Sequence, residues 1–207
     1  MKNKELSKVT VILRGYKYET VRNICLAIEK TRHIRNLEIT LNTEDALNII
    51  SKISNEFGDR LNIGAGTVTN LNSAKSAIKA GARFILSPTV LEKEVVDYAK
   101  EEGVITVCGA LTPSEILQGI NNGCNIIKIF PVSTISKSYF KDIRAPLGNF
   151  PIMAVGGVNK ENAKVFFEDG ANYIGLGGLF SSKTLKENDY KKMCEECIEF
   201  EALVFGE

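Results

Sequence analysis

The sequence lacks the features that mark several classes of protein. Its charges nearly cancel at a net of +1, and its basic residues are scattered rather than clustered as in nucleic-acid-binding proteins. It contains no apolar run long enough to span a bilayer and no charged-then-apolar leader. We therefore expect no nucleic-acid partner, no membrane partner and a cytoplasmic location.

Cysteine and histidine are also scarce. Five cysteines are an odd number for a disulfide framework, and Cys25, Cys108 and Cys124 lie in apolar segments, which favours a reducing compartment. The Cys-x-x-Cys of residues 194–197 has no second pair and no histidine nearby, so we predict a plain helix there rather than a metal or redox site. The single histidine, His33, is predicted to lie at the surface with no catalytic part.

What the 207 residues do contain is a regular alternation of short β-branched runs and amphipathic helical segments. The expected strands are Val9–Leu13, Leu37–Leu41, Leu61–Ala65, Arg83–Leu86, Val104–Val107, Ile126–Phe130, Ile152–Val155 and Tyr173–Leu176. The expected helices are Glu19–Lys30, Thr43–Phe57, Asn72–Ala80, Glu92–Glu101, Pro113–Asn121, Ser136–Arg144, Lys160–Glu168 and Asp189–Phe200.

This alternation predicts an α/β protein in which residues 1–207 form a single-domain (β/α)8 TIM barrel. A doubly wound open sheet is the alternative fold. It is less favoured because no Gly-x-Gly-x-x-Gly follows the first strand. In a barrel the active site lies where the strands end, so polar residues at those positions are the candidates for function.

One lysine stands in the middle of an apolar strand. Lys128 lies within the predicted strand Ile126–Phe130, where desolvation of an ammonium is costly and lowers its pKa. A neutral amine of this kind is the nucleophile that forms Schiff bases. The alternative is a structural lysine on an edge strand whose stem extends to water.

Two further charges are predicted to meet Lys128 inside the barrel. Side chains alternate between the faces of a strand, which puts Glu38, Thr40 and Asn42 on one face and Arg14 on the face of Ile12. If these faces point inward, a lysine, a carboxylate and an arginine converge and compensate one another's burial. The alternative is a purely structural network of buried ion pairs.

Pairs of glycines follow the last two predicted strands. They are Gly156 with Gly157, and Gly177 with Gly178. Glycine lets backbone N–H groups approach an anion, and barrels bind phosphate after strands seven and eight, so the pairs predict a phosphate site. Tight turns without a ligand are the alternative reading of either pair alone.

Several ordered motifs together resemble one known family. They are Ile12–Gly15, Leu37–Thr43, Ile63–Val68, Ser87-Pro88, Ile127–Pro131, Ala154–Val158 and Gly175–Gly178. Over about Val9–Phe180 the chain resembles the 2-keto-3-deoxy-6-phosphogluconate (KDPG) and 4-hydroxy-2-oxoglutarate (KHG) aldolases, class I aldolases on a small (β/α)8 barrel. The resemblance implies a small-molecule 2-oxo acid as substrate, a homotrimer, and no metal or cofactor.

The resemblance also implies a role for each matching residue. Lys128 would form the Schiff base and Glu38 would be the general acid and base, in the reversible cleavage of a 2-keto-3-deoxy-6-phospho sugar acid to pyruvate and glyceraldehyde 3-phosphate. Arg14 and Thr67 would contact the keto-acid portion of the substrate. The other substrate-binding residues would be Asn42, Pro88, Phe130 and, for the phosphate, Gly156, Gly157, Gly177 and Gly178.

Two positions of the sequence do not decide which substrate is used. Many phosphogluconate-type members carry arginine where this chain has Asn42, whereas the branch acting on 2-keto-3-deoxy-6-phosphogalactonate (KDPGal) has asparagine. Some members place a serine after the last glycine pair, where this chain has Leu179, so unphosphorylated KHG is a further candidate. Two other functions stay open: a metal-free phosphate-binding isomerase, epimerase or synthase, and a non-catalytic barrel that binds a phosphometabolite.

Overall fold

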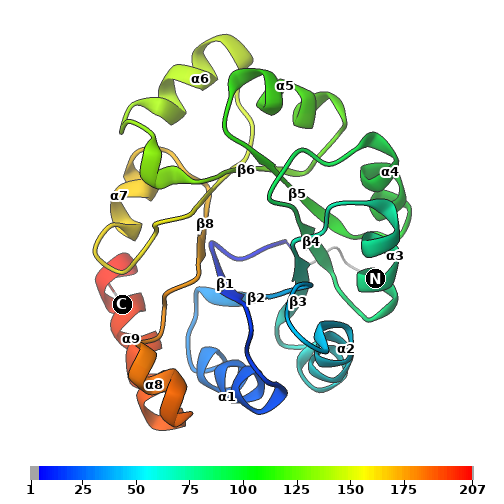
Figure 1. The fold of residues 1–207 in the computed structure, drawn as a ribbon. Helices are drawn as coiled ribbons and strands as arrows, with labels where there is room; N and C mark the ends of the chain where they lie inside the picture. Colours follow the sequence, from blue (N-terminus) through cyan, green and yellow to red (C-terminus); the bar gives the residue numbers. More distant parts are fainter. Residues whose placement is uncertain (1–4, 207) are drawn as a thin grey trace.

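Eight parallel strands form one closed barrel in the structure, a computed structural model that describes residues 5–206. Neighbouring strands follow chain order, and β1 pairs with both β2 and β8, which closes the sheet. Figure 1 shows the helices arranged around the strands, and the (β/α)8 barrel predicted from the sequence is confirmed. The strands are β1 (Val9–Leu13), β2 (Ile34–Thr40), β3 (Asn62–Gly66), β4 (Phe84–Leu86), β5 (Ile105–Ala110), β6 (Ile126–Ile129), β7 (Ile152–Val155) and β8 (Tyr173–Leu176).

The helices follow the strands as predicted, with two additions, the 3-10 turn η1 and the short helix α8. They are α1 (Tyr18–Ile28), α2 (Ala46–Phe57), α3 (Leu71–Lys79), α4 (Lys93–Glu101), α5 (Pro113–Asn121), the 3-10 turn η1 (Val132–Thr134), α6 (Tyr139–Leu147), α7 (Ala163–Glu168), α8 (Ser182–Glu187) and α9 (Tyr190–Phe205). The sequence did not predict α8, a helix of six residues that begins where the Ser181 side chain accepts a hydrogen bond from the Thr184 N–H. No helix of the described residues is long and apolar enough to cross a membrane.

The start of α7 differs from the prediction in a way that affects the site. The predicted helix began at Lys160, but α7 begins at Ala163 because two asparagines fold the preceding residues into a separate turn. The Asn159 N–H donates to the Asn162 Oδ1 at 2.8 Å, and the Asn162 N–H donates to the Asn159 Oδ1 at 3.1 Å. The first turn of α7 therefore lies further along the chain from the glycine pair of β7 than the sequence suggested.

Alternating side chains divide the sheet into two faces. Outward-facing residues such as Val9, Val11 and Leu13 are buried against the helices in the larger core. A second cluster packs together on the other face and consists of Leu6, Phe84, Leu86, Val107, Ile126, Met153 and Val155. Because Ile126 and Lys128 share a face of β6, the charged residues of the site lie directly next to this apolar cluster.

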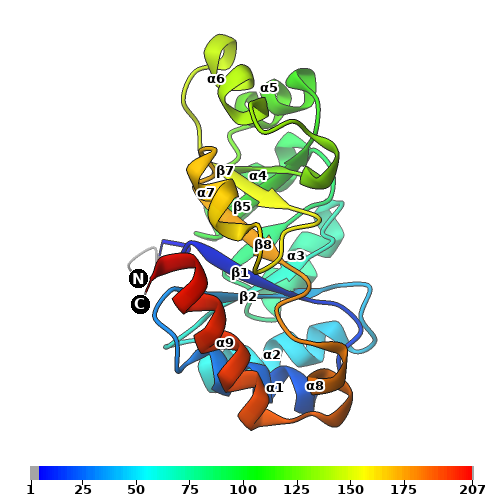
Figure 2. The ribbon, with the colours of Figure 1, turned by 90° about the vertical axis from the view of Figure 1, so that its left-hand side faces the viewer.

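The last helix, α9, holds the segment that leads into β2. Figure 2 shows α9 running alongside α1, and the two helices are in contact. The buried carboxylate of Glu201 on α9 accepts hydrogen bonds from the N–H groups of Arg32, at 2.9 Å, and His33. The His33 ring stacks on Phe205 with 4.2 Å between ring centroids, so this histidine, predicted to lie at the surface, is half-buried by α9. Residues 194–197 lie in α9 as predicted, and both cysteines are free thiols.

Candidate active site

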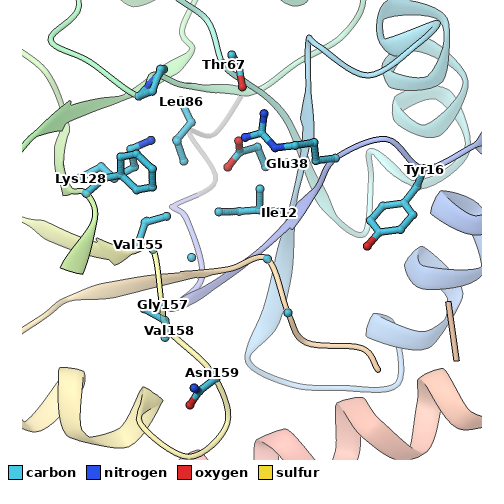
Figure 3. A pocket seen from close by; sticks show the side chains of 17 residues that line it. Ile12, Tyr16, Glu38, Thr67, Leu86, Lys128, Val155, Gly157, Val158 and Asn159 are labelled. Carbon is cyan, nitrogen blue, oxygen red and sulfur yellow. The ribbon is translucent and has the colours of Figure 1, made fainter. Parts of the chain in front are cut away.

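A pocket of about 570 Å³ opens at the carboxyl ends of the strands. Its walls come from the strand ends of the barrel and the loops that follow them, the position where barrels of this class carry their active sites. The lining residues are Ile12, Arg14, Tyr16, Glu38, Thr67, Leu86, Pro88, Lys128, Phe130, Val155, Gly156, Gly157, Val158, Asn159, Gly175, Gly177 and Gly178. Figure 3 shows the side chains of this pocket.

Lys128 of β6 reaches the pocket from an apolar surrounding. The residue is only 4% exposed, and its Nζ lies 4.9 Å from the centroid of the Phe130 ring. Burial lowers the pKa of Lys128 to about 8, the nearby carboxylate of Glu38 raises it, and Arg14 lowers it. About one-tenth of the amine is therefore neutral at pH 7, far more than for an ordinary lysine, and the neutral form is the one that attacks a carbonyl.

Glu38 faces Lys128 from the other side of the barrel, since β2 and β6 lie opposite each other in a ring of eight strands. Burial raises the pKa of this carboxyl to about 7, while Lys128 and Arg14 act in the opposite direction. Its Oε2 is buried and accepts no hydrogen bond from any residue in the range 5–206. The pKa of Glu38 is thus close to neutral pH, and one of its oxygens is free in the pocket. Both properties suit a group that gives and takes protons.

Thr67 enters the pocket from a strained backbone. It follows β3 with a φ of 60°, a left-handed conformation that is rare for a β-branched residue. Such strain persists only where the surroundings impose it, and it is common at functional sites. Here it turns the chain at the mouth of the barrel and leaves Thr67 half-buried on the pocket wall.

Pro88 is brought into the pocket by a glycine on the neighbouring strand. A Cβ on Gly109 of β5 would lie 2.4 Å from the backbone carbonyl of Pro88, so only glycine allows this close approach. The Gly109 N–H also donates to the Thr89 carbonyl at 3.1 Å. The loop after β4 is therefore fixed across the end of β5, beside Lys128, which pairs with Gly109 in register.

The two glycine pairs differ in conformation. Gly156 and Gly157 have φ values of 90° and 88°, and a Cβ on Gly157 would lie 2.8 Å from the Cβ of Ser133, so this pair needs glycine for both backbone and space. Gly177 and Gly178 are exposed, and a Cβ on either would meet nothing within 4 Å. Both pairs line the pocket, the first as a tightly packed turn and the second as an open edge.

Asn42 is the one predicted site residue that does not line the pocket. The chain leaves the sheet after Thr40, the last residue of β2, so the alternation that placed Asn42 on the face of Glu38 no longer applies. Asn42 lies exposed in the turn that follows. The other predicted residues, from Arg14 to Gly178, are all brought together in the pocket.

Known proteins are similar to this chain in sequence and in fold. A family model described as KDPG and KHG aldolase matches residues 2–196. The chain is 32% identical over 182 residues to the probable 2-dehydro-3-deoxy-6-phosphogalactonate aldolase of Rhizobium meliloti, an alignment that covers 87% of this chain and 85% of that protein. The chain belongs to the KDPG and KHG aldolase family.

Further relatives agree with this membership. A 2-dehydro-3-deoxy-phosphogluconate aldolase of Pseudoalteromonas atlantica is 37% identical over 132 residues, 62% of this chain and 60% of that one. A solved structure described as native KDPGal structure superposes with a TM-score of 0.84 at 26% identity, over 98% of both chains. The family resemblance inferred from the sequence motifs is thus confirmed.

The structure adds pocket residues to those that the motifs of the KDPG and KHG aldolase family suggested. They are Ile12, Tyr16, Leu86, Val155, Val158, Asn159 and Gly175. Period-two alternation had placed Ile12 on the strand face of Arg14, but Ile12 was not named as a site residue. Tyr16 lies beyond the strand, and no sequence signal marks it. Among residues 5–206, no group of three histidine, cysteine, aspartate or glutamate side chains is arranged to hold a metal ion.

Proposed function

We propose that this protein is a class I aldolase that reversibly cleaves a 2-keto-3-deoxy-6-phospho sugar acid to pyruvate and glyceraldehyde 3-phosphate. One observation carries the proposal: a buried amine with a lowered pKa, Lys128, shares a pocket with a buried carboxyl with a raised pKa, Glu38. Two groups tuned in this way perform covalent and acid-base chemistry at neutral pH. The relatives named phosphogalactonate and phosphogluconate aldolases support the substrate class.

The first half of the reaction forms a covalent adduct. The neutral Nζ of Lys128 attacks the C2 carbonyl carbon of the substrate, the C–N bond forms, and a proton passes from the nitrogen to the former carbonyl oxygen. The protonated carboxyl of Glu38 then gives its proton to the C2 hydroxyl, which leaves as water. The product is an iminium ion on Lys128 and a carboxylate on Glu38.

The second half breaks the C3–C4 bond. The Glu38 carboxylate accepts the proton of the C4 hydroxyl, and the electrons of the C3–C4 bond move into the iminium, which becomes an enamine. The aldehyde leaves, Glu38 returns its proton to C3, and water hydrolyses the resulting iminium to release pyruvate. A carboxyl with a pKa of about 7 can alternate between the two protonation states that these steps require.

The rest of the pocket is proposed to hold the substrate. Arg14 and Thr67 bind the carboxylate beside the reacting carbonyl, because a guanidinium and a hydroxyl are natural donors to a carboxylate. Phe130 and Pro88 form the wall around Lys128 and keep its surroundings apolar. The backbone N–H groups of the two glycine pairs, 156–157 and 177–178, bind the phosphate.

Trapping of the adduct tests the proposal directly. Incubation with pyruvate and borohydride is expected to leave reduced pyruvate on Lys128, identified by peptide mass spectrometry. Lys128→Ala should lose both the adduct and cleavage activity, while Lys93→Ala, an exposed lysine on α4, should retain both. Absence of an adduct, or its appearance on another lysine, would overturn the Schiff-base mechanism in favour of acid-base chemistry or simple binding.

The identity of the aldol requires a comparison of substrates. We propose that position 42 contributes to the choice between KDPG and KDPGal, whose configurations differ at C4, although Asn42 lies outside the pocket lining. The ratio of kcat/KM for the two substrates should change in Asn42→Arg. Equal ratios in Asn42→Arg and the parent would show that position 42 does not discriminate between KDPG and KDPGal. In the parent, faster cleavage of KHG than of either phosphorylated substrate would identify KHG as the substrate.

Assembly and location complete the proposal. We propose a homotrimer, as the family resemblance implies, which light scattering would detect as three times the chain mass of 22.8 kDa. A mass equal to one or two chains would contradict it. We also propose a cytoplasmic location, which the five free cysteines support, because unpaired thiols are typical of reducing compartments.

A further inference from the structure

Tyr16 carries a polar group into the pocket that the proposed reaction does not use. Its ring is half-buried and packs against the core, and its hydroxyl makes no hydrogen bond with any of the residues that the structure describes. Burial raises the pKa of the phenol, so the hydroxyl keeps its proton at neutral pH. A phenol at a pocket wall without a protein partner is available to donate to a bound ligand.

The turn that presents Tyr16 is held in place by buried threonines. Gly15 has a φ of 77°, and its N–H donates to the Thr43 Oγ1 at 2.9 Å. The Thr43 hydroxyl lies 3.1 Å from the Thr40 hydroxyl, which in turn donates to the Leu13 carbonyl at 3.3 Å. The hydrogen bonds join the end of β1 to the end of β2 and so hold the turn that precedes Tyr16.

The position of Tyr16 fits one end of the proposed substrate. Figure 3 shows Lys128 and Tyr16 at opposite sides of the pocket, with Glu38 and Ile12 between them. A substrate bonded through C2 to Lys128 has its carboxylate next to the lysine, and its C6 phosphate is the group furthest from it along the chain. A substrate that extends across the pocket from Lys128 would place this phosphate on the side of Tyr16.

Asn159 is another polar residue of the pocket lining, and of its two amide atoms only Oδ1 is engaged with the described residues. The Oδ1 of Asn159 accepts the N–H groups of Glu161 and Asn162, each at 3.1 Å, and so stabilises the turn before α7. At the end of β8, Leu179 offers no polar side chain at all. A terminal phosphate would have the backbone N–H groups and the Asn159 amide as neutral donors, and the Tyr16 hydroxyl adds a further one.

We propose that the Tyr16 hydroxyl donates a hydrogen bond to the terminal phosphate of the substrate and so selects phosphorylated over unphosphorylated 2-oxo acids. The inference rests on the proposed aldolase function and adds a specificity-determining residue to it. Tyr16 takes no part in bond making, and its effect is confined to binding of the distal end.

Removal of the hydroxyl alone tests this role. Tyr16→Phe is expected to raise the KM for the preferred phosphorylated substrate by about tenfold with little change in kcat, the loss of one hydrogen bond to a charged group. The pyruvate concentration that half-saturates borohydride labelling of Lys128 should not change, because pyruvate has no distal group. Tyr98→Phe is the matched control, since Tyr98 lies on α4 outside the pocket and contacts Lys75.

The possible outcomes separate this inference from the function it rests on. An unchanged KM for the phosphorylated substrate in Tyr16→Phe, or an equal loss of affinity for pyruvate, would overturn the role of Tyr16 while leaving the aldolase intact. Failure of pyruvate to label Lys128 in the unaltered protein would instead overturn the aldolase function, and the Tyr16 inference with it. Equal thermal stability of the two phenylalanine variants and the parent ensures that binding is compared in folded protein.

Discussion

A Cβ on Gly66 of β3 would lie 1.5 Å from the Oε1 of Glu38. The carboxylate of β2 therefore lies across the backbone of the neighbouring strand, in space that only a residue without a side chain leaves free. Gly66 thus determines where Glu38 points, although it has no chemistry of its own.

Gly66→Ala is expected to displace Glu38 and lower kcat/KM by roughly 10²- to 10⁴-fold, the usual effect of losing a general acid and base. Gly64→Ala is the control on the same strand, because its Cβ would meet the Phe84 ring at 2.5 Å rather than Glu38. Both variants should lose stability in urea denaturation. If both also lost activity to the same degree, disruption of the barrel would explain the effect and Gly66 would have no particular link to Glu38.

The pH dependence of cleavage should report the pair formed by Lys128 and Glu38. With pKa values of about 8 and about 7, the pair carries a single proton between these values, and that state contains the reactive form with neutral lysine and protonated carboxyl. We expect a bell-shaped profile of kcat/KM with its maximum between about pH 7 and 8. In Glu38→Gln the pKa of Lys128 should fall further, because the carboxylate that raises it is gone.

Borohydride labelling by pyruvate, followed against pH, measures this shift in the variant. Labelling that begins at lower pH in Glu38→Gln than in the parent is the expected result. Labelling at the same pH in both proteins would show that the two groups do not interact.

Lys128 and Glu38 should lower the stability of the folded protein in the pH range in which they are most active. Burial raises the pKa of Glu38 from 4.5, so its contribution to stability is lost as pH rises through about 7. Burial lowers the pKa of Lys128 from 10.5, so its contribution is lost as pH falls through about 8. Between these values both groups are charged in the apolar pocket, and the free energy of unfolding should pass through a local minimum.

A double variant, Glu38→Gln with Lys128→Met, should be inactive and more stable than the parent at pH 7.5 by about 1–3 kcal/mol, as for other buried ion pairs replaced by uncharged residues. Urea denaturation at several pH values checks this. The gain should shrink below pH 4.5, where Glu38 is neutral in both the folded and the unfolded protein, and above pH 10.5, where Lys128 is neutral in both. A double variant less stable than the parent at pH 7.5 would identify the pair as a structural ion pair.

Thr67 should show opposite effects on stability and binding. Its left-handed backbone costs about 1–3 kcal/mol, which glycine would not incur, while glycine loses about 0.5–1 kcal/mol through the unfolded state. Thr67→Gly should therefore be at least as stable as the parent, yet bind pyruvate about tenfold more weakly because the hydroxyl is gone.

Thr69→Gly, at an exposed position two residues on with an ordinary backbone, is the control for Thr67→Gly. It should lose about 0.5–1 kcal/mol and keep its affinity for pyruvate. Marked destabilisation of Thr67→Gly would mean that the threonine side chain supports the fold more than the site.

The sequence alone determined the barrel and most of the site. Alternation of strands and helices is a local property, and so is the period of two that put Lys128 and Glu38 on inward faces. Both can therefore be inferred without knowing which segments meet. The same rule failed for Asn42, because it holds only while the chain stays in the sheet, and β2 ends at Thr40.

Only the tertiary structure decided the relationships between distant segments. Nothing in the sequence indicated that Gly66 leaves space for Glu38, or that Thr43 holds the turn that presents Tyr16. These contacts join residues from different strands and loops, and they exist only once β1 and β8 have paired and closed the barrel. The pKa values of Lys128 and Glu38 have the same origin, because burial in the closed barrel is their largest cause.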